Sequence, residues 1–172
     1  AYAMRINHEG ANPVPTGLAF RGNLWADTAG TMNDFSDTLA GQVGTVVLAR
    51  NGYWNAGNPL PNDPTDVVNI TNDASAVTGN PLLPSPAALV TPVWNETSGT
   101  FGGGHATIRA AFVALVEAYG RPGAGGAGVG AADPAQMPAT DILGRMRDAA
   151  PDLGAYEIGA VGVLFANGFE GA

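Results

Sequence analysis

The stretch that decides the predicted fold is DILGRMRDAAPDLGAYE, residues 141–157. Asp152 follows Pro151, and an Asp at such a turn accepts hydrogen bonds from backbone N–H groups. Gly154 permits a tight backbone beside it. We therefore expect Asp152 to bind backbone or arginine donors and Tyr156 to be substantially buried.

The charged residues of this stretch are predicted to close it as a structural clasp. Arg145 or Arg147 is expected to pair with one of the two acids, Asp152 and Glu157. A functional role for these acids is the alternative. The structural role is favoured because Asp and Gly at a tight turn already serve the backbone.

This signature resembles the end of bacterial right-handed parallel β-helix proteins with a choice-of-anchor Q domain. The segment Asn80-Pro-Leu-Leu83 also fits the start of that pattern, whereas Ser85-Pro-Ala-Ala88 matches a further element only in part and at the wrong distance. The resemblance implies a solenoid that is displayed on, or released from, the cell surface. The end of the chain, Leu164–Glu170, is similar to a short tail of exported bacterial proteins.

An internal repeat points to the same architecture. The segment LAFRGNLW, residues 18–25, aligns with VLARNGYW, residues 47–54, at an offset of 29, and a further step of 29 leads to residues 76–83. A repeat of this length is typical of solenoids, whose coils must stack to bury their cores. Residues near 20, 49 and 78 are therefore expected to be neighbours on parallel strands.

Asparagine recurs at one place in the repeat, as Asn23, Asn51 and Asn80. Two interpretations stay open. The side chains stack and hydrogen-bond from coil to coil, as amide ladders do, or each Asn only marks a turn.

A helix is expected over residues 106–119, where apolar residues recur with helical spacing. Thr107 is a candidate N-cap, and Gly120 with Pro122 ends the helix. We interpret it as a cover for the last coil; binding to a membrane surface or a partner is the alternative.

The predicted fold class is thus all-β, a right-handed parallel β-helix made of C-terminal coils with one short capping α-helix. Residues 1–83 form β-helix coils, 84–157 the terminal coil with the helix and the closing signature, and 158–172 an apolar tail. The first coil has no cover of its own, so an assembly is expected, with 158–170 as the donated surface.

Composition excludes several classes of function. The 172 residues include no Lys and no Cys, and the net charge is −8. A nucleic-acid binder needs a basic face, and anionic lipid also attracts basic segments. The longest apolar run, residues 158–166, is too short to span a bilayer. No signal peptide is recognised in the sequence as it stands.

The candidate chemical residues are few. Asp34 and Asp37 are the best-placed carboxylate pair, and polysaccharide hydrolases use such pairs as acid and base. A solvated turn is the favoured interpretation. His8 and His105 lack a third ligand at a recognisable spacing, and the glycines before His105 lack the Lys of a phosphate loop.

No catalytic, cofactor-binding or metal-binding residue is therefore predicted, and no cofactor. The predicted function is a non-catalytic extracellular β-helix module, as a surface fibre, adhesin or filament subunit. The alternative is the C-terminal part of a β-helix polysaccharide lyase or hydrolase. The expected partners are copies of the chain or the rest of a longer β-helix, with polysaccharide as a candidate ligand. The expected location is extracellular or at the cell surface.

Overall fold

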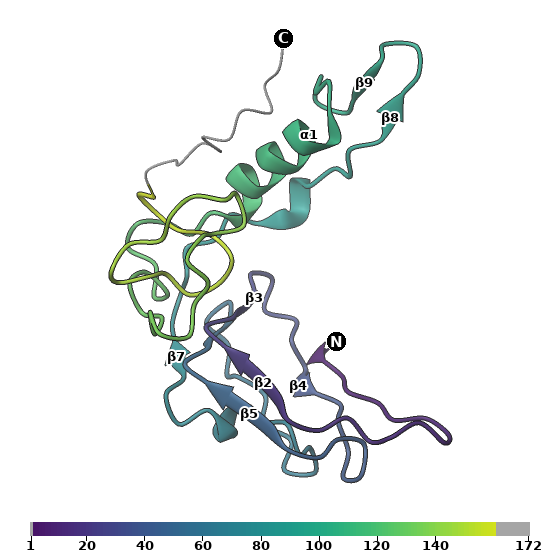
Figure 1. Ribbon diagram of the computed structural model, residues 1–172, viewed down its shortest axis with the longest axis vertical. Helices are drawn as coiled ribbons and strands as arrows, with labels where there is room; N and C mark the ends of the chain where they lie inside the picture. The colour runs from purple at the N-terminus through teal and green to yellow at the C-terminus, as the bar shows by residue number, and fades with distance from the viewer. Residues whose placement is uncertain (1, 161–172) are drawn as a thin grey trace.

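The structure is a computed structural model that describes residues 2–160 (Figure 1). Its strands are short: β1 (Tyr2–Met4), β2 (Leu18–Arg21), β3 (Leu24–Asp27), β4 (Asp34–Ser36), β5 (Val46–Ala49), β6 (Gly52–Asn55), β7 (Val77–Thr78), β8 (Trp94–Asn95) and β9 (Thr100–Phe101). Its helices are two 3₁₀ turns, η1 (Ile70–Asn72) and η2 (Pro86–Ala88), the α-helix α1 (Ile108–Leu115) and the π-helical turn η3 (Val116–Gly120).

Strands β1 to β7 gather at one end of the molecule, whereas α1 and the hairpin β8–β9 lie at the other (Figure 1). The last described part, residues 121–160, lies between them and contains no strand. No helix among the described residues combines the length and apolar character needed to cross a membrane.

The strands of the first group pair in parallel. β1 pairs with β4, β2 with β5, and β3 with β6, which also pairs with β7. Leu18 lies opposite Val46 and Leu24 opposite Gly52, so the register is 28 residues and not the predicted 29. The expected proximity of residues near 20 and 49 is thus observed. Val77 lies opposite Gly52, a shorter step, so the third segment does not keep the period.

The predicted right-handed parallel β-helix is nevertheless wrong as the fold class. The described residues form four separate sheets of two or three strands, and no strand exceeds four residues. After Thr78 the pairing of strands changes, because β8 and β9 form an antiparallel hairpin. Gly and Pro recur through residues 120–134, and neither residue favours a strand interior. The chain therefore has no C-terminal coils in its described part.

The predicted helix exists, but not as a cap on a coil. Thr107 is its N-cap, and its Oγ accepts a hydrogen bond from Ala110 N at 3.1 Å. Ala111 is the one residue of α1 that is buried, and the helix lies away from the strand group (Figure 1). The helix therefore does not cover the core of the strand group.

That core is aromatic. Trp25 stacks on Tyr53 with ring centroids 5.4 Å apart, and Phe35 packs edge-on against both rings at 5.3 Å. Tyr53, Phe35 and Val68 are fully buried, and Leu48 and Val43 nearby are buried as well. Each such ring pair contributes about 0.5–1.5 kcal/mol beyond the area it buries, which fixes the strands around the cluster.

The last part of the chain that the structure describes attaches to the strand group through backbone and side-chain hydrogen bonds. Gly154 N donates to Gly22 O at 2.7 Å, and the Arg50 Nε donates to Ala131 O at 2.9 Å. Gly22 has φ +64°, and a Cβ at this position would collide with Met137. The backbone conformation therefore favours glycine at Gly22, and a Cβ here would also force the Met137 side chain to shift.

Candidate functional site

The closing segment begins with a turn that Asp141 organises. Its Oδ1 accepts the backbone N–H groups of Leu143 and Arg145, each at 2.9 Å. Gly144 has φ +80° and donates to Asp141 O at 3.0 Å, so the Asp-x-x-Gly spacing itself produces the turn. Oδ2 of Asp141 accepts the Arg145 guanidinium at 2.6 and 2.9 Å. Both N–H groups converge on this one oxygen, and such charge-assisted hydrogen bonds are stronger than neutral ones.

Arg145 joins this turn to the π-helical turn η3. Its Nη1 donates to Tyr156 Oη at 3.1 Å and lies 3.4 Å from Glu117 Oε1, while Tyr156 Oη donates to Glu117 Oε2 at 2.8 Å. The guanidinium also lies over the Tyr156 ring, 4.1 Å from its centroid. Glu117, Asp141, Arg145 and Tyr156 therefore form one connected network.

This network determines how Asp141 titrates. Burial raises the pKa of Asp141, but the hydrogen bonds and charge of Arg145 outweigh it, so the pKa lies below its usual value. The pKa of Arg145 is raised, because bonds to Asp141 and Tyr156 outweigh its own burial. Both groups are charged at neutral pH.

A second pair lies deeper. Arg147 and Glu157 form an ion pair at 2.8 Å, and their side chains are only 4% and 1% exposed. Arg147 also donates to Gly154 O at 2.7 Å and Asp152 O at 3.1 Å, while Glu157 Oε2 accepts Asp152 N at 2.9 Å. Arg147 Nε is buried and has no hydrogen-bond partner among residues 2–160.

The clasp predicted from the sequence is confirmed here. Tyr156 is buried, and Asp152 accepts the backbone N–H groups of Gly130 and Ile158, each at 2.7 Å. Of the two arginines, Arg147 pairs with Glu157. Arg145 instead forms ion pairs with Asp141 and Glu117, two acids that the sequence analysis does not name as partners of the arginines.

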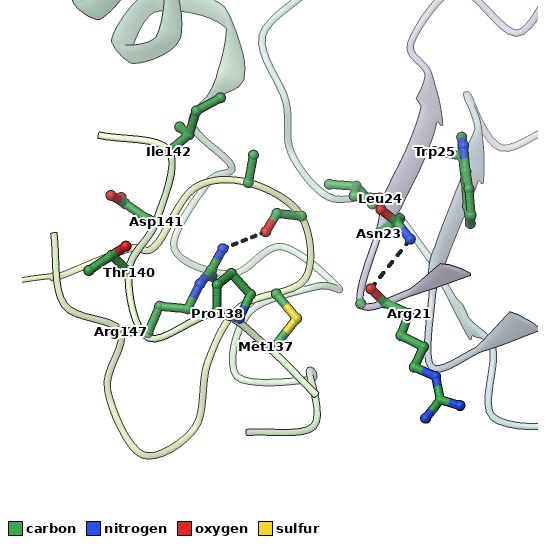
Figure 2. Close-up of a pocket in the computed structure, with 13 residues that line it drawn as sticks. Arg21, Asn23, Leu24, Trp25, Met137, Pro138, Thr140, Asp141, Ile142 and Arg147 are labelled. Carbon is green, nitrogen blue, oxygen red and sulfur yellow. Dashed lines mark hydrogen bonds between the residues drawn. The ribbon is translucent and has the colours of Figure 1, made fainter. Parts of the chain in front are cut away.

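A cleft of about 490 Å³ opens between the strand group and this segment (Figure 2). One wall comes from the junction of β2 and β3, and the other from residues 137–142. The lining residues are Arg21, Gly22, Asn23, Leu24, Trp25, Met137, Pro138, Thr140, Asp141, Ile142, Arg147, Gly154 and Ala155.

The charged side chains of the cleft already have protein partners. Asp141 and Arg147 hold the contacts above, and Arg21 Nη1 donates to Gln136 Oε1 at 2.7 Å. General acid–base catalysis needs a group free to exchange a proton with substrate. The arrangement of these three residues is instead suited to hold the walls of a binding cleft in place.

Asp34 and Asp37, the candidate carboxylate pair, have different partners. Asp37 pairs with Arg5 at 3.1 Å, whereas Asp34 meets Asp63 and Asp66, with one carboxylate oxygen of each within 4.8 Å of the others. Burial and the neighbouring charge of Asp34 raise the pKa of Asp66. Asp63 and Asp66 lie about thirty residues after Asp34 in the sequence, so no local spacing predicts that the three carboxylates meet.

These three carboxylates are the kind of oxygen ligand that Ca²⁺ takes. Acidic side chains alone do not define a metal site, and we assign none. His8 follows β1 and His105 precedes α1, and neither belongs to a cluster of three ligating residues in the part of the chain that the structure describes. The glycines before His105 form the turn after β9, with Gly103 and Gly104 at φ +85° and +80°.

No family model matches this chain, and no curated protein sequence matches it. The resemblance to choice-of-anchor Q proteins thus rests on the sequence motif of residues 141–157.

Proposed function

We propose that this protein is a non-catalytic extracellular module that acts by binding, as an adhesin, a surface fibre or a filament subunit. The extracellular location rests on the resemblance of the closing segment. The role in binding rests on two features of the described residues. The charged side chains of the cleft are bound by other groups of the protein, and the hairpin β8–β9 exposes apolar side chains.

The hairpin is the observation that carries the proposal. Val90 and Val93, in the segment that leads into the hairpin, are 76% and 71% exposed, and Trp94 of the hairpin is 46% exposed although its ring packs on Phe101 at 5.0 Å. The hairpin projects from the end of the molecule opposite the strand group (Figure 1). Exposed apolar patches on a folded chain mark interaction surfaces, and tryptophan is enriched at their centres.

We propose a second copy of the chain as the partner of this surface. Light scattering on the purified protein at micromolar concentration should give a mass above that of one chain, 17.3 kDa. Replacing Val93 and Trp94 together with Ser should return the mass to that of one chain. Val14→Ser is the matched control, because Val14 is 41% exposed but lies in the strand group. A wild-type chain that stays monomeric at every concentration would refute the proposal.

The alternative, a polysaccharide lyase or hydrolase, would use the cleft. Asp141 and Arg147 are held there by the protein itself. Incubation with a panel of uronate-containing polysaccharides should release no shorter products. Shorter products released by the wild-type protein would establish the enzyme instead.

A further inference from the structure

Asp34 of β4 meets Asp63 and Asp66, and no arginine among residues 2–160 forms an ion pair with any of the three. The carboxylates alone define no metal site, but Ser36 adds a buried hydroxyl on the same face of β4. We propose that these three acids and Ser36 bind one Ca²⁺ ion, and we call them the acidic site. The proposal is independent of the assembly surface on the hairpin.

The distances between the three carboxylates suit a single ion. One oxygen of each lies within 4.8 Å of the others. Ca²⁺ takes oxygen ligands at about 2.3–2.6 Å, so two ligands of one ion lie at most about 5.2 Å apart. Asp34 and Asp66 are half-buried and Asp63 is exposed. An ion can therefore enter from solvent, and water can complete its shell of about six to eight oxygens.

The acidic site holds negative charges that repel one another. Burial and the charges of Asp34 and Asp63 raise the pKa of Asp66, as expected where like charges share a site. Asp63 is nevertheless held in place, because its Oδ1 accepts the Thr65 backbone N–H and hydroxyl at 2.8 and 2.7 Å. A divalent cation would remove the repulsion and would meet ligands that are already positioned.

Ser36 is the independent observation that points to a ligand. Phe35 packs in the aromatic core, and successive side chains of a strand point to opposite faces, so Asp34 and Ser36 share the other face of β4. Segment 63–67, which carries the other two acids, lies against this part of the chain, since its last residue donates a backbone hydrogen bond to Thr38 O at 3.0 Å. Ser36 is only 1% exposed, and its Oγ has no hydrogen-bond partner among residues 2–160. A buried hydroxyl without a partner is costly, whereas a cation on this face of the strand would use it as an oxygen ligand.

Equilibrium dialysis with radioactive Ca²⁺ tests the proposal on the full chain after treatment with EDTA. In about 0.15 M NaCl, which screens exposed charges, wild type should bind one ion per chain with a Kd of about 0.1–1 mM, the range of extracellular Ca²⁺ modules. Asp66→Asn should weaken binding roughly tenfold or more, because loss of a ligand costs at least as much as loss of an outer-shell partner. Glu96→Gln is the matched control, since it removes one exposed acid from the hairpin and should leave the affinity unchanged.

Ser36→Ala distinguishes a ligand from a residue that only supports the fold. Without Ca²⁺ this variant should be at least as stable as wild type, because it loses a buried hydroxyl that has no partner among the described residues. Its affinity for Ca²⁺ should nevertheless fall, whereas Ser98→Ala, at an exposed position on the hairpin, should bind as wild type does. Urea unfolding in EDTA checks that every variant is folded.

Three results would overturn the proposal. The first is the absence of saturable binding by wild type. The second is an equal loss of affinity in Asp66→Asn and Glu96→Gln, since Ca²⁺ would then act only as a counterion to the net charge of −8. The third is an unchanged affinity in Ser36→Ala. Each result can occur while the hairpin still assembles, so the failure of this proposal is distinguishable from failure of the proposed function.

Discussion

Asp73 accepts both the backbone N–H and the side-chain amide of Asn51, each at 2.9 Å, and both residues are buried. Asn51 Oδ1 in turn accepts the backbone and amide N–H groups of Asn23 at 3.0 and 3.1 Å. A polar column therefore crosses three successive segments of the strand group. Buried polar groups persist only when they are satisfied in this way.

Asp73→Ala should destabilise the protein by about 3 kcal/mol. The change leaves Asn51 and the Tyr53 hydroxyl, which donates to Asp73 at 3.2 Å, without their acceptor in the core. Urea unfolding followed by tryptophan fluorescence measures the loss. Glu96→Ala, at an exposed position on the hairpin, should change little. Equal midpoints for the two variants would mean that the column does not stabilise the fold.

Sequence reasoning found part of this column and missed the rest. The Asn23 and Asn51 contact was one of the two interpretations of the repeat, and it is observed. The third position is taken by Asp73 and not by Asn80, because β7 joins β6 three residues earlier than a constant period requires. Registers between short strands depend on loop lengths, which a repeat search does not weigh.

The closing clasp could be predicted in part because its chemistry is local: Asp152 and Glu157 are five residues apart. The pairing of Arg145 with Asp141, within one turn, was not predicted. The overall fold class could not be predicted, because it depends on whether coils continue after Thr78. The closing motif carries no information about the hairpin and the helix that lie between Thr78 and the motif in the sequence.

Asp141 should make the protein more sensitive to acid. Its pKa is lower in the folded state than its usual value of about 3.9. A depressed carboxyl pKa adds stability that is present above the unfolded pKa and is lost as pH falls through the folded one. Wild type should therefore lose stability below about pH 4 more steeply than Asp141→Asn. Denaturant midpoints from pH 6 to pH 2.5 measure this, with Glu96→Gln expected to follow wild type. A parallel loss in Asp141→Asn would contradict the assignment.

The buried ion pair Arg147–Glu157 should contribute more to stability than the exposed ion pair Arg5–Asp37. Glu157→Gln leaves Arg147 charged and buried, and removing one partner of such a pair costs about 3–5 kcal/mol. Asp37→Asn acts on the pair with Arg5, whose side chains are 49% and 36% exposed, and should cost about 0–1 kcal/mol. Thermal and urea unfolding of both variants give the comparison. A smaller loss for Glu157→Gln than for Asp37→Asn would show that the buried pair is not formed.

Gly22→Ala should weaken the contact between the closing segment and the strand group, because the Met137 side chain must shift to admit the added Cβ. An alanine there must adopt φ near +64°, and its Cβ would collide with Met137 beside the hydrogen bond from Gly154. Gly10→Ala is the matched control, because Gly10 has φ +60° with no atom within 4 Å of the added Cβ. Backbone strain of about 1–2 kcal/mol is common to both variants, so any further loss at Gly22 reports the contact itself. Hydrogen exchange should then show faster exchange at Gly154 N in Gly22→Ala but not in Gly10→Ala. Equal stability and exchange in the two variants would mean that Gly22 is needed only for its backbone conformation.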